Sequence, residues 1–268
     1  MTQPPNIATQ DNPRPVNASM PLRFRGRAIR ALLFDLDGTL YAQRRLRWVM
    51  GAKLALLPFT GLSPSAARET WKVLRIFRRV REELREVPPG SASLAELQYT
   101  AAAEKAGVPP ARVQALVERW MYERPLPHLA ACRRPGIVEL LEFLAARGVP
   151  CGVFSDYPVD AKLAYLDLEK GFSIRICATD PDVNAFKPHP QGFLKACALW
   201  GFPPADVLYV GDRPEVDARG AGACGMPCAI VGRKSSRNVV AAGEAEHIRV
   251  NSFHDLLREL ATEVSTPR

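Results

Sequence analysis

The sequence predicts an α/β protein with a doubly wound parallel sheet and an inserted all-helical segment. Short apolar runs that end in polar residues recur along the chain, and helical patterns separate most of them. The segment 43–129 differs, because it contains helical patterns and no run typical of a strand. With 268 residues, 47% of them hydrophobic and 24% charged, the chain has the size and composition of a globular protein of one large or two small domains.

Five apolar runs predict the strands of the sheet, at 29–35, 149–155, 174–179, 206–212 and 228–232. Continuous apolar runs of this length are typical of parallel strands that are covered on both faces. The helical pattern at 135–148 begins with Pro135 and ends with Gly148, as helices often do. The alternation of strands and helices predicts right-handed crossovers and helices on both sides of the sheet.

Four helical patterns fill the insertion, at 44–57, 64–87, 93–106 and 110–122. Gly and Pro residues separate them, as at Gly107 and Pro109. We therefore expect a helical cap at 43–129 inserted into an α/β core made of 28–42 and 130–268. The first 27 residues, rich in Pro and Asn, have no signal-peptide pattern, and we expect a disordered tail there.

The net charge of +8 is concentrated in the expected cap. Between residues 41 and 90 there are eleven Lys and Arg residues against four acidic residues. Such a segment favours phosphorylated small molecules, nucleic acid or an anionic membrane surface, and an ordinary solvated helix face would also account for it. Aromatic residues interleave poorly with the arginines, so nucleic acid is disfavoured. No apolar run approaches the ~20 residues of a transmembrane helix, which leaves peripheral membrane contact of the cap open.

The six cysteines show no pair at CxxC spacing. A zinc site is therefore not expected. Free thiols are typical of a reducing compartment, and we expect a cytoplasmic protein.

Polar residues gather at the carboxyl ends of the expected strands, where open α/β sheets bind their ligands. The candidates are Asp35, Asp37, Gly38 and Thr39 after the first strand, Ser155 and Asp156 after the second, Lys187 after the third, and Asp212 and Asp217 after the fourth. Ordinary structural roles are also open to some of them. Ser155 could be the N-cap of the next helix, Asp217 a first-turn acid, and Lys187 a surface residue. Asp156 could be a plain loop acid.

This set of groups suits chemistry on a phosphate monoester, which is doubly anionic. Asp35 would attack the phosphorus as a nucleophile, and Asp37 would act as general acid and then as general base. Mg²⁺ prefers oxygen ligands, and Asp35 and Asp212 are the side chains expected to bind it. Lys187 would supply positive charge, and Ser155 a hydroxyl hydrogen bond, to the phosphoryl oxygens.

Four motifs in this order resemble the haloacid dehalogenase superfamily: "DLDGT" at 35–39, Ser155 in "VFSD", Lys187 in "FKP", and "GDRPEVD" at 211–217. The resemblance spans 29–231 and puts the helical segment at the position of a class I cap. It implies that the backbone carbonyl of Asp37 also binds Mg²⁺ and that Asp217 orients metal-bound water or Lys187. It further implies phosphate binding near Gly38, Thr39 and Asp156.

The chain looks like the phosphoglycolate-phosphatase-like branch of that superfamily. We therefore expect a Mg²⁺-dependent phosphatase that hydrolyses a small organic phosphate through an aspartyl-phosphate, with an extra anionic or an amphiphilic group on its substrate. Carbon–halogen hydrolysis is disfavoured because those members lack the second acid, here Asp37. A phosphotransferase or phosphomutase, and a non-catalytic module that binds anions through the basic cap, remain alternatives.

Overall fold

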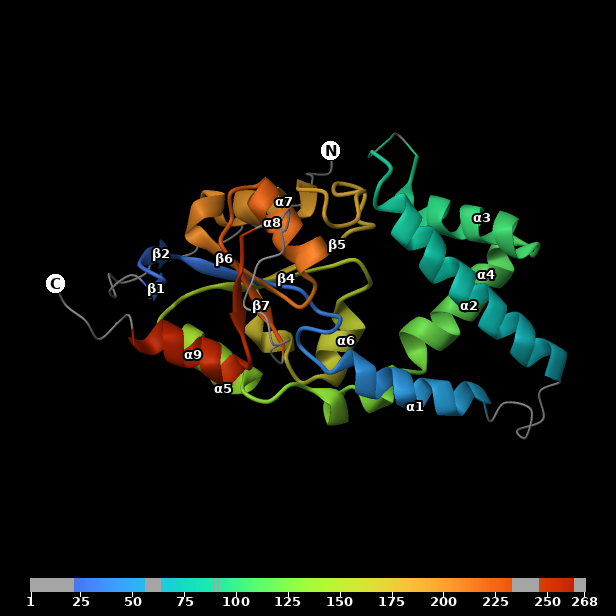
Figure 1. Cartoon of the computed structure of the whole chain (residues 1–268), viewed down its shortest axis with the longest axis horizontal. Coiled ribbons are helices and arrows are strands. Elements are labelled where there is room, and N and C mark those ends of the chain that lie inside the picture. Colours follow the sequence, from blue (N-terminus) through green and yellow to red (C-terminus); the bar gives the residue numbers. More distant parts are fainter. Residues whose placement is uncertain (1–21, 56–63, 89, 91, 233–245, 263–268) are drawn as a thin grey trace, which may run out of the picture.

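In the computed structural model a six-stranded parallel sheet forms the centre of the molecule, and helices cover both of its faces (Figure 1). The structure describes residues 22–55, 64–88, 90, 92–232 and 246–262. In sheet order the strands are β5 (Ile174–Cys177), β4 (Cys151–Ser155), β3 (Ala31–Phe34), β6 (Val207–Gly211), β7 (Cys228–Val231) and β8 (Ile248–Val250). The predicted fold class and all five predicted strands are confirmed. β8 was missed because Arg249 interrupts its short apolar run.

Alternate residues of the strands enter two separate cores. Leu32 and Phe34 pack on one face of the sheet, and Ala31 and Leu33 on the other. Helices α5 (Ile137–Ala145), α6 (Asp160–Tyr165) and α9 (Phe253–Thr262) cover the first face, and α7 (Gln191–Trp200) and α8 (Arg219–Ala223) the second. Burial on both sides explains why the strands read as continuous apolar runs.

The expected disordered tail is wrong for residues 22–27. They belong to an antiparallel hairpin of β1 (Leu22–Phe24) and β2 (Arg27–Ile29). Leu22 and Phe24 are buried against the first core, and Arg25 and Gly26 both have positive φ in the two-residue turn between the strands. The alternation in "LRF" followed by Arg-Gly is the signal that was missed; residues 1–21 lie outside the described ones.

The helical segment has a core of its own. It contains α1 (Gln43–Ala55), α2 (Pro64–Leu84), α3 (Leu94–Ala106) and α4 (Pro110–Val117). Val73 and Phe77 of α2 pack with Ala102 of α3 and Val113 of α4. The chain beyond α4 continues as a π-helical turn, Glu118–Glu123, so the predicted helix 110–122 changes its geometry near its end. Part of the predicted helix 44–57 lies outside the described residues.

Short helical turns complete the described part of the chain. They are the 3₁₀ turns Leu126–His128, Ala130–Cys132, Glu169–Gly171 and Pro204–Asp206 and the π-helical turn Pro214–Ala218.

The order of the strands places the first of them at the centre of the sheet. β3 pairs with β4 on one side and with β6 on the other, so the strand order reverses there. The helical segment leaves directly after β3 and returns beside it, because the Ala42 N–H donates to the Cys132 carbonyl at 2.8 Å. The loop after β3 therefore lies between the sheet and the helices, at the position where such sheets bind ligands.

All six cysteines are free thiols. Among the helices of the described residues, none has the length and hydropathy that crossing a bilayer would require.

Candidate active site

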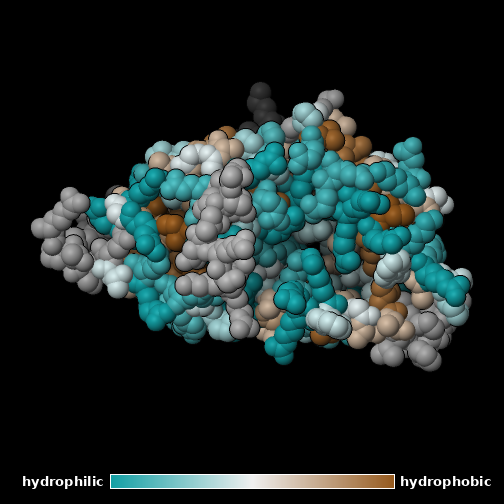
Figure 2. All heavy atoms as spheres, in the orientation of Figure 1, coloured by the Kyte–Doolittle hydropathy of each residue, from teal (hydrophilic) through white to brown (hydrophobic). Residues whose placement is uncertain are grey.

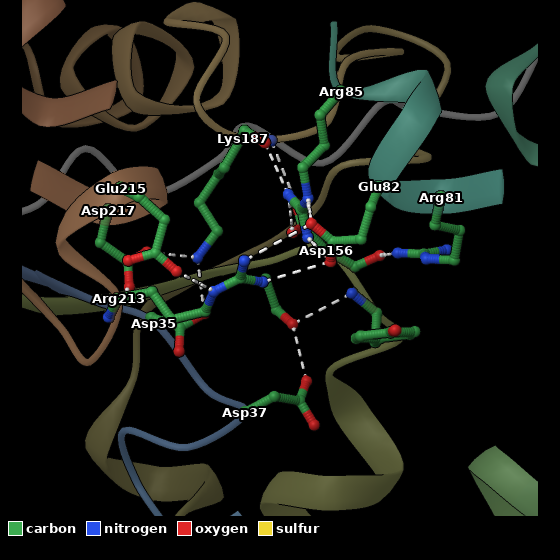
Figure 3. Close-up of polar contacts among 12 residues, drawn as sticks. Asp35, Asp37, Arg81, Glu82, Arg85, Asp156, Lys187, Arg213, Glu215 and Asp217 are labelled. Carbon is green, nitrogen blue, oxygen red and sulfur yellow. Dashed lines mark hydrogen bonds and ion pairs between the residues drawn. The ribbon is translucent and has the colours of Figure 1, made fainter. Parts of the chain in front are cut away.

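A buried lysine joins three strand ends in the loops above the sheet (Figure 3). The Nζ atom of Lys187 donates to Asp35 Oδ1 at 2.6 Å and to Asp217 Oδ1 at 2.8 Å. It also donates to the hydroxyl of Tyr209, a residue of β6, at 2.9 Å. Asp35 is the first residue after β3, and Asp217 lies in the π-helical turn that follows β6. The loops after three different strands therefore meet at one ammonium group.

Three carboxylates crowd together beside this lysine. Ligand oxygens of Asp35, Asp212 and Asp217 lie within 4.8 Å of one another. Burial, together with Asp217 and Asp212, raises the pKa of Asp35 to about 8, although Lys187 opposes this. Burial and Asp217 likewise raise the pKa of Asp212 to about 7. For Lys187, burial opposes its charge, but Asp217 and Asp35 outweigh it and the pKa is raised. Three ionised acids here would carry more negative charge than the one lysine neutralises.

The contacts of each acid show which of them suit a divalent cation. Asp217 has both oxygens engaged, Oδ1 by Lys187 and Tyr209 and Oδ2 by the backbone N–H groups of Asp212 and Arg213. Asp212 Oδ1, in contrast, is buried and has no hydrogen-bond partner among the described residues. A buried oxygen of this kind suits a hard cation that takes oxygen ligands. The donor set therefore fits Mg²⁺ on Asp35 and Asp212, with Asp217 holding the loop around them.

Because Gly38 has no side chain, the carboxylate of Asp212 can pack directly against it. Its φ of +102° is one that L side chains rarely adopt, and an added Cβ would lie 2.2 Å from Asp212 Oδ2. Arg134 holds this turn from outside by donating to the Gly38 carbonyl at 2.7 and 3.0 Å. The glycine in "DLDGT" is thus required both by the backbone and by the acid opposite it.

Asp37 lies apart from the three acids and has partners of its own. Lys162 of α6 places its Nζ 2.6 and 2.7 Å from the two carboxylate oxygens. The Tyr41 hydroxyl also donates to Asp37, and Ser155 Oγ lies 3.2 Å from Oδ2. Lys162 is buried and lies seven residues beyond Ser155, on the helix that follows β4. Asp37 is therefore fixed in one orientation by three donors.

Two interpretations from the sequence, that Ser155 could be a helix N-cap and that Asp156 binds phosphate, need correction. Ser155 is not a helix N-cap, because α6 begins only at Asp160; its hydroxyl accepts the N–H of Tyr157 at 3.1 Å. Asp156 is not placed to bind phosphate through its side chain. Its carboxylate pairs with Arg85 at 2.6 Å and accepts the backbone N–H of Lys187 at 3.1 Å. An acid so engaged positions the Lys187 loop.

The hydroxyl of Thr39 also has an internal role. Its Oγ1 is fully buried and donates to Asp35 Oδ2 at 2.9 Å. The side chain of Thr39 therefore orients the carboxylate of Asp35, and any contact with a phosphate would have to come from the backbone of this residue.

Arg81 of α2 and Arg85, the first residue after α2, connect the helical segment to the site (Figure 3). Arg85 donates to the Lys187 carbonyl at 2.5 Å as well as to Asp156. Arg81 is buried, donates to the Asp156 carbonyl at 2.6 Å and stacks over the ring of Tyr157 at 4.0 Å. The last turn of α2 and the residue after it thus contact the loops after β4 and β5, and the helices are held against the α/β part of the molecule.

The structure brings Asp35, Lys187, Asp212 and Asp217 into one cluster, with Asp37 and Ser155 next to it. Sequence reasoning missed Lys162, Arg85 and Tyr41, and also Tyr209 and Arg134. A lysine or arginine inside an amphipathic helix has no local mark that separates it from a solvated one. Tyr41 could have been noticed, because it lies in the same connection after β3 as Asp35 and Asp37.

Comparison with known proteins agrees with this arrangement. A family model described as haloacid dehalogenase-like hydrolase matches residues 29–225. The phosphoglycolate phosphatase of Shigella dysenteriae serotype 1 is 29% identical over 219 residues, which cover 73% of this chain and 79% of that protein. The glyceraldehyde 3-phosphate phosphatase of Methanopyrus kandleri is 26% identical over 250 residues, 88% of this chain and all of that protein.

Solved structures show the same fold. A HAD phosphatase from Thermococcus onnurineus superposes with a TM-score of 0.59 at 24% identity, over 87% of this chain and 98% of its own. A 2-haloacid dehalogenase from Pseudomonas syringae pv. Tomato DC3000 superposes with a TM-score of 0.60 at 24% identity, over 88% of this chain and 99% of its own.

The sheet, the acid cluster and the matches together define a hydrolase with a Rossmann-like α/β core. The chain belongs to the haloacid dehalogenase-like hydrolases.

Proposed function

We propose that the protein is a Mg²⁺-dependent phosphatase that hydrolyses an organic phosphate monoester through an aspartyl-phosphate on Asp35. The observation that carries this proposal is the geometry around that residue. One oxygen of Asp35 is held by Lys187 and the other by Thr39, and two further acids lie beside it. A carboxylate positioned in this way, at the carboxyl edge of the sheet, suits nucleophilic attack on an anionic substrate.

In the first step an oxygen of Asp35 forms a bond to phosphorus while the bond from phosphorus to the leaving oxygen breaks. Lys187 stabilises the negative charge on the phosphoryl oxygens. Asp37 gives a proton to the leaving alkoxide, which departs as the alcohol. To do so, Asp37 exchanges one of its contacts with Lys162 or Tyr41 for the leaving oxygen.

In the second step Asp37 takes a proton from water, whose oxygen attacks the phosphorus of the aspartyl-phosphate. The bond between phosphorus and Asp35 breaks, and inorganic phosphate and the free carboxylate of Asp35 are produced. Asp37 returns to its protonated form, so the cycle closes.

Asp35, Asp212 and the backbone carbonyl of Asp37 would hold Mg²⁺. When bound, the ion neutralises negative charge on the acids and on the phosphate. Asp217 would keep Lys187 and the loop of Asp212 in place, as its four hydrogen bonds indicate.

The relatives support a phosphatase over the alternatives. Both curated relatives named above are phosphatases. Asp37 is present at the position where an acid is needed for the leaving oxygen, whereas carbon–halogen hydrolysis needs none there. The buried carboxylate cluster speaks against a purely non-catalytic module, because buried charges are costly unless they serve a purpose.

We further propose that residues 43–129 form a cap and that 28–42 with 130–268 form the α/β core. The separate hydrophobic core of α2, α3 and α4 supports this division. A cap in this position would exclude water and contact the leaving group.

Release of inorganic phosphate from p-nitrophenyl phosphate tests the activity. We expect turnover with Mg²⁺, loss of turnover with excess EDTA, and recovery on addition of Mg²⁺. Unchanged turnover in EDTA would contradict the metal dependence, and an absence of phosphate release with Mg²⁺ present would contradict the phosphatase.

A further inference from the structure

The space above the acid cluster is larger than a small phosphate ester needs. A cavity of about 1810 Å³ extends from Asp35 to the residues of α1 and α2. Figure 2 shows the molecular surface hollowed between the α/β part and the helices, with hydrophilic side chains at its edge. Pockets for small ligands usually measure about 300–1,000 Å³. A substrate of two or three carbons would leave most of this volume to water.

The size of the cavity is not the result of a cap that has swung away. Arg85 and Arg81 bind the loops after β4 and β5 at 2.5 to 2.6 Å. Glu82, from the same turn of α2, forms a further ion pair with Arg213 at 3.3 Å. The cavity therefore belongs to an arrangement in which the helices already touch the site.

The cap side of this cavity carries an excess of positive charge, because the one acid among its described lining residues, Glu82, pairs with Arg85 and Arg213. Among the described lining residues from Gln43 to Arg78, six are basic and none is acidic. They are Arg44, Arg47, Arg68, Lys72, Arg75 and Arg78. Glu69 lies in the same stretch of α2 but points to Arg112 and does not line the cavity. A lining of this kind attracts an anion.

Arg78 is the clearest member of this group. It has no hydrogen bond and no ion pair in the part of the chain that the structure describes, and it lies close enough to Arg47 to be repelled by it. Burial, together with Arg47, lowers the pKa of Arg78. The planar guanidinium is the group that proteins use to bind phosphate and carboxylate with two hydrogen bonds. Arg47 lines the same cavity, and two guanidinium groups near each other on its wall form a site for one anionic group.

The arginine pair is connected to the acid cluster through one aromatic ring. Tyr157 interacts electrostatically with Arg78, and its ring centroid lies 4.9 Å from Lys162 Nζ. Lys162 in turn contacts Asp37, the residue that we place at the leaving oxygen. The leaving group of a bound ester would therefore extend past Tyr157 toward Arg78.

Apolar side chains line the same part of the cavity. Met50 and Leu54 of α1 and Trp71 of α2 contribute there, and Arg75 stacks over the ring of Trp71 at 4.6 Å. The region thus offers both apolar surface and cations, which suits a ligand body with a planar or apolar part between its anionic ends.

We propose that this chamber binds a second anionic group of the substrate, so that the protein acts on a phosphate monoester of sugar or nucleotide size whose leaving group carries a further phosphate or carboxylate, held by Arg47 and Arg78. This substrate class rests on the proposed phosphatase function. It assigns to the excess charge of α1 and α2 a specific role at the site.

Matched substrate pairs test the proposal. Fructose 1,6-bisphosphate is compared with fructose 1-phosphate, and adenosine 3′,5′-bisphosphate with adenosine 3′-phosphate. We expect kcat/KM to be at least about tenfold higher for the doubly anionic member of at least one pair, since one charged hydrogen-bond pair accounts for such a factor. Equal kcat/KM within both pairs would overturn the proposal.

Variants then locate the effect. Arg78→Gln should lower the preference ratio of the responding pair about tenfold. Arg79→Gln, at the next residue on the same helix, is a matched control because Arg79 does not line the cavity, so it should leave the ratio unchanged. An equal fall in both variants, or an unchanged ratio in Arg78→Gln, would overturn the proposal.

Measurements of binding test the second anion site independently of the proposed phosphatase activity. The dissociation constants of the same four compounds are measured by calorimetry on the Asp35→Asn variant. A preference for the doubly anionic member that Arg78→Gln removes would support the chamber even if the wild-type protein releases no phosphate, and the phosphatase proposal alone would then fail. No preference in binding, in a protein that hydrolyses p-nitrophenyl phosphate, would overturn the chamber alone.

Discussion

The ion pair between Arg85 and Asp156 joins the helical segment to the loop of Lys187, and its removal leads to a specific prediction. Both side chains are only 8% exposed, and the charged atoms lie 2.6 Å apart. Arg85→Met would leave the Asp156 carboxylate buried without its cation. Removing one partner of a buried pair costs about 3–5 kcal/mol, because the other charge remains uncompensated. We expect a loss of that size in the free energy of unfolding at pH 7.

Urea unfolding followed by circular dichroism measures this loss, and a double-mutant cycle assigns it to the pair. Asp156→Asn removes the charge that Arg85→Met leaves behind. The double variant should therefore be less destabilised than the sum of the two single variants. Lys105→Met serves as a control, because its ion pair with Glu83 is about half exposed and should contribute less than about 1 kcal/mol.

The contribution of Asp156 to the free energy of unfolding should change with pH in one direction. Burial alone would raise the pKa of Asp156, but Arg85, Lys187 and Arg81 together lower it below the ordinary value of 3.8. A lowered carboxyl pKa contributes stability that is fully present above the unfolded value and is lost as the pH falls through the folded value. The stability that this carboxylate contributes to the wild type should therefore be constant from pH 7 to about pH 5 and should be lost as the pH falls below 3.8. A loss below about 1 kcal/mol at pH 7, or additive single variants, would refute the reasoning.

Three further predictions concern the site itself. Gly38→Ala should lose about 1–3 kcal/mol in unfolding free energy, because alanine is strained at φ +102° and its Cβ would meet Asp212; an unfolding curve like that of the wild type would contradict this. Lys162→Met should lower kcat for p-nitrophenyl phosphate at least about tenfold, because Asp37 loses the cation that orients it, and Lys162→Arg should restore part of the loss; wild-type kcat in Lys162→Met would rule out this role. Mg²⁺ at 100 times its dissociation constant should add about 2.7 kcal/mol to the stability of the wild type and much less to that of Asp212→Asn, as thermal unfolding would show; equal gains would place the ion elsewhere.

The strands of the sheet could be predicted because each is marked by the residues of its own short run. Four of the five predicted strands, β3, β4, β6 and β7, are buried along their whole length because both faces of the sheet are covered, and four of the five runs end in a polar residue that marks the carboxyl edge. The strand β8 could not be predicted, because it has only two apolar residues and the sequence around it does not extend them into an apolar run. The β1–β2 hairpin had a signal, the alternation before Gly26, which the Pro-rich residues upstream obscured.

The residues of the candidate site likewise include some that the sequence predicts and some that it does not. Asp35, Lys187 and Asp212 could be named from the sequence because chain position alone puts them at strand ends. Arg85 could not be named, because it is one of eleven basic residues between 41 and 90 and only its contacts in the folded chain distinguish it. The resemblance implied phosphate binding near Asp156, but its carboxylate is paired with Arg85, a residue 71 positions away in the chain.

The phosphorylated state of Asp35 is the most direct test of the whole account. The Asp37→Asn variant, in which the water lacks its general base, is mixed with p-nitrophenyl phosphate and Mg²⁺, quenched in acid within the first turnover and reduced with borohydride, which converts an aspartyl-phosphate to homoserine. Mass spectrometry of the peptide that contains residue 35 should then find homoserine at that position. Stoichiometric release of nitrophenol with an unmodified aspartate at position 35, or with the modification on a different acid, would contradict Asp35 as the nucleophile.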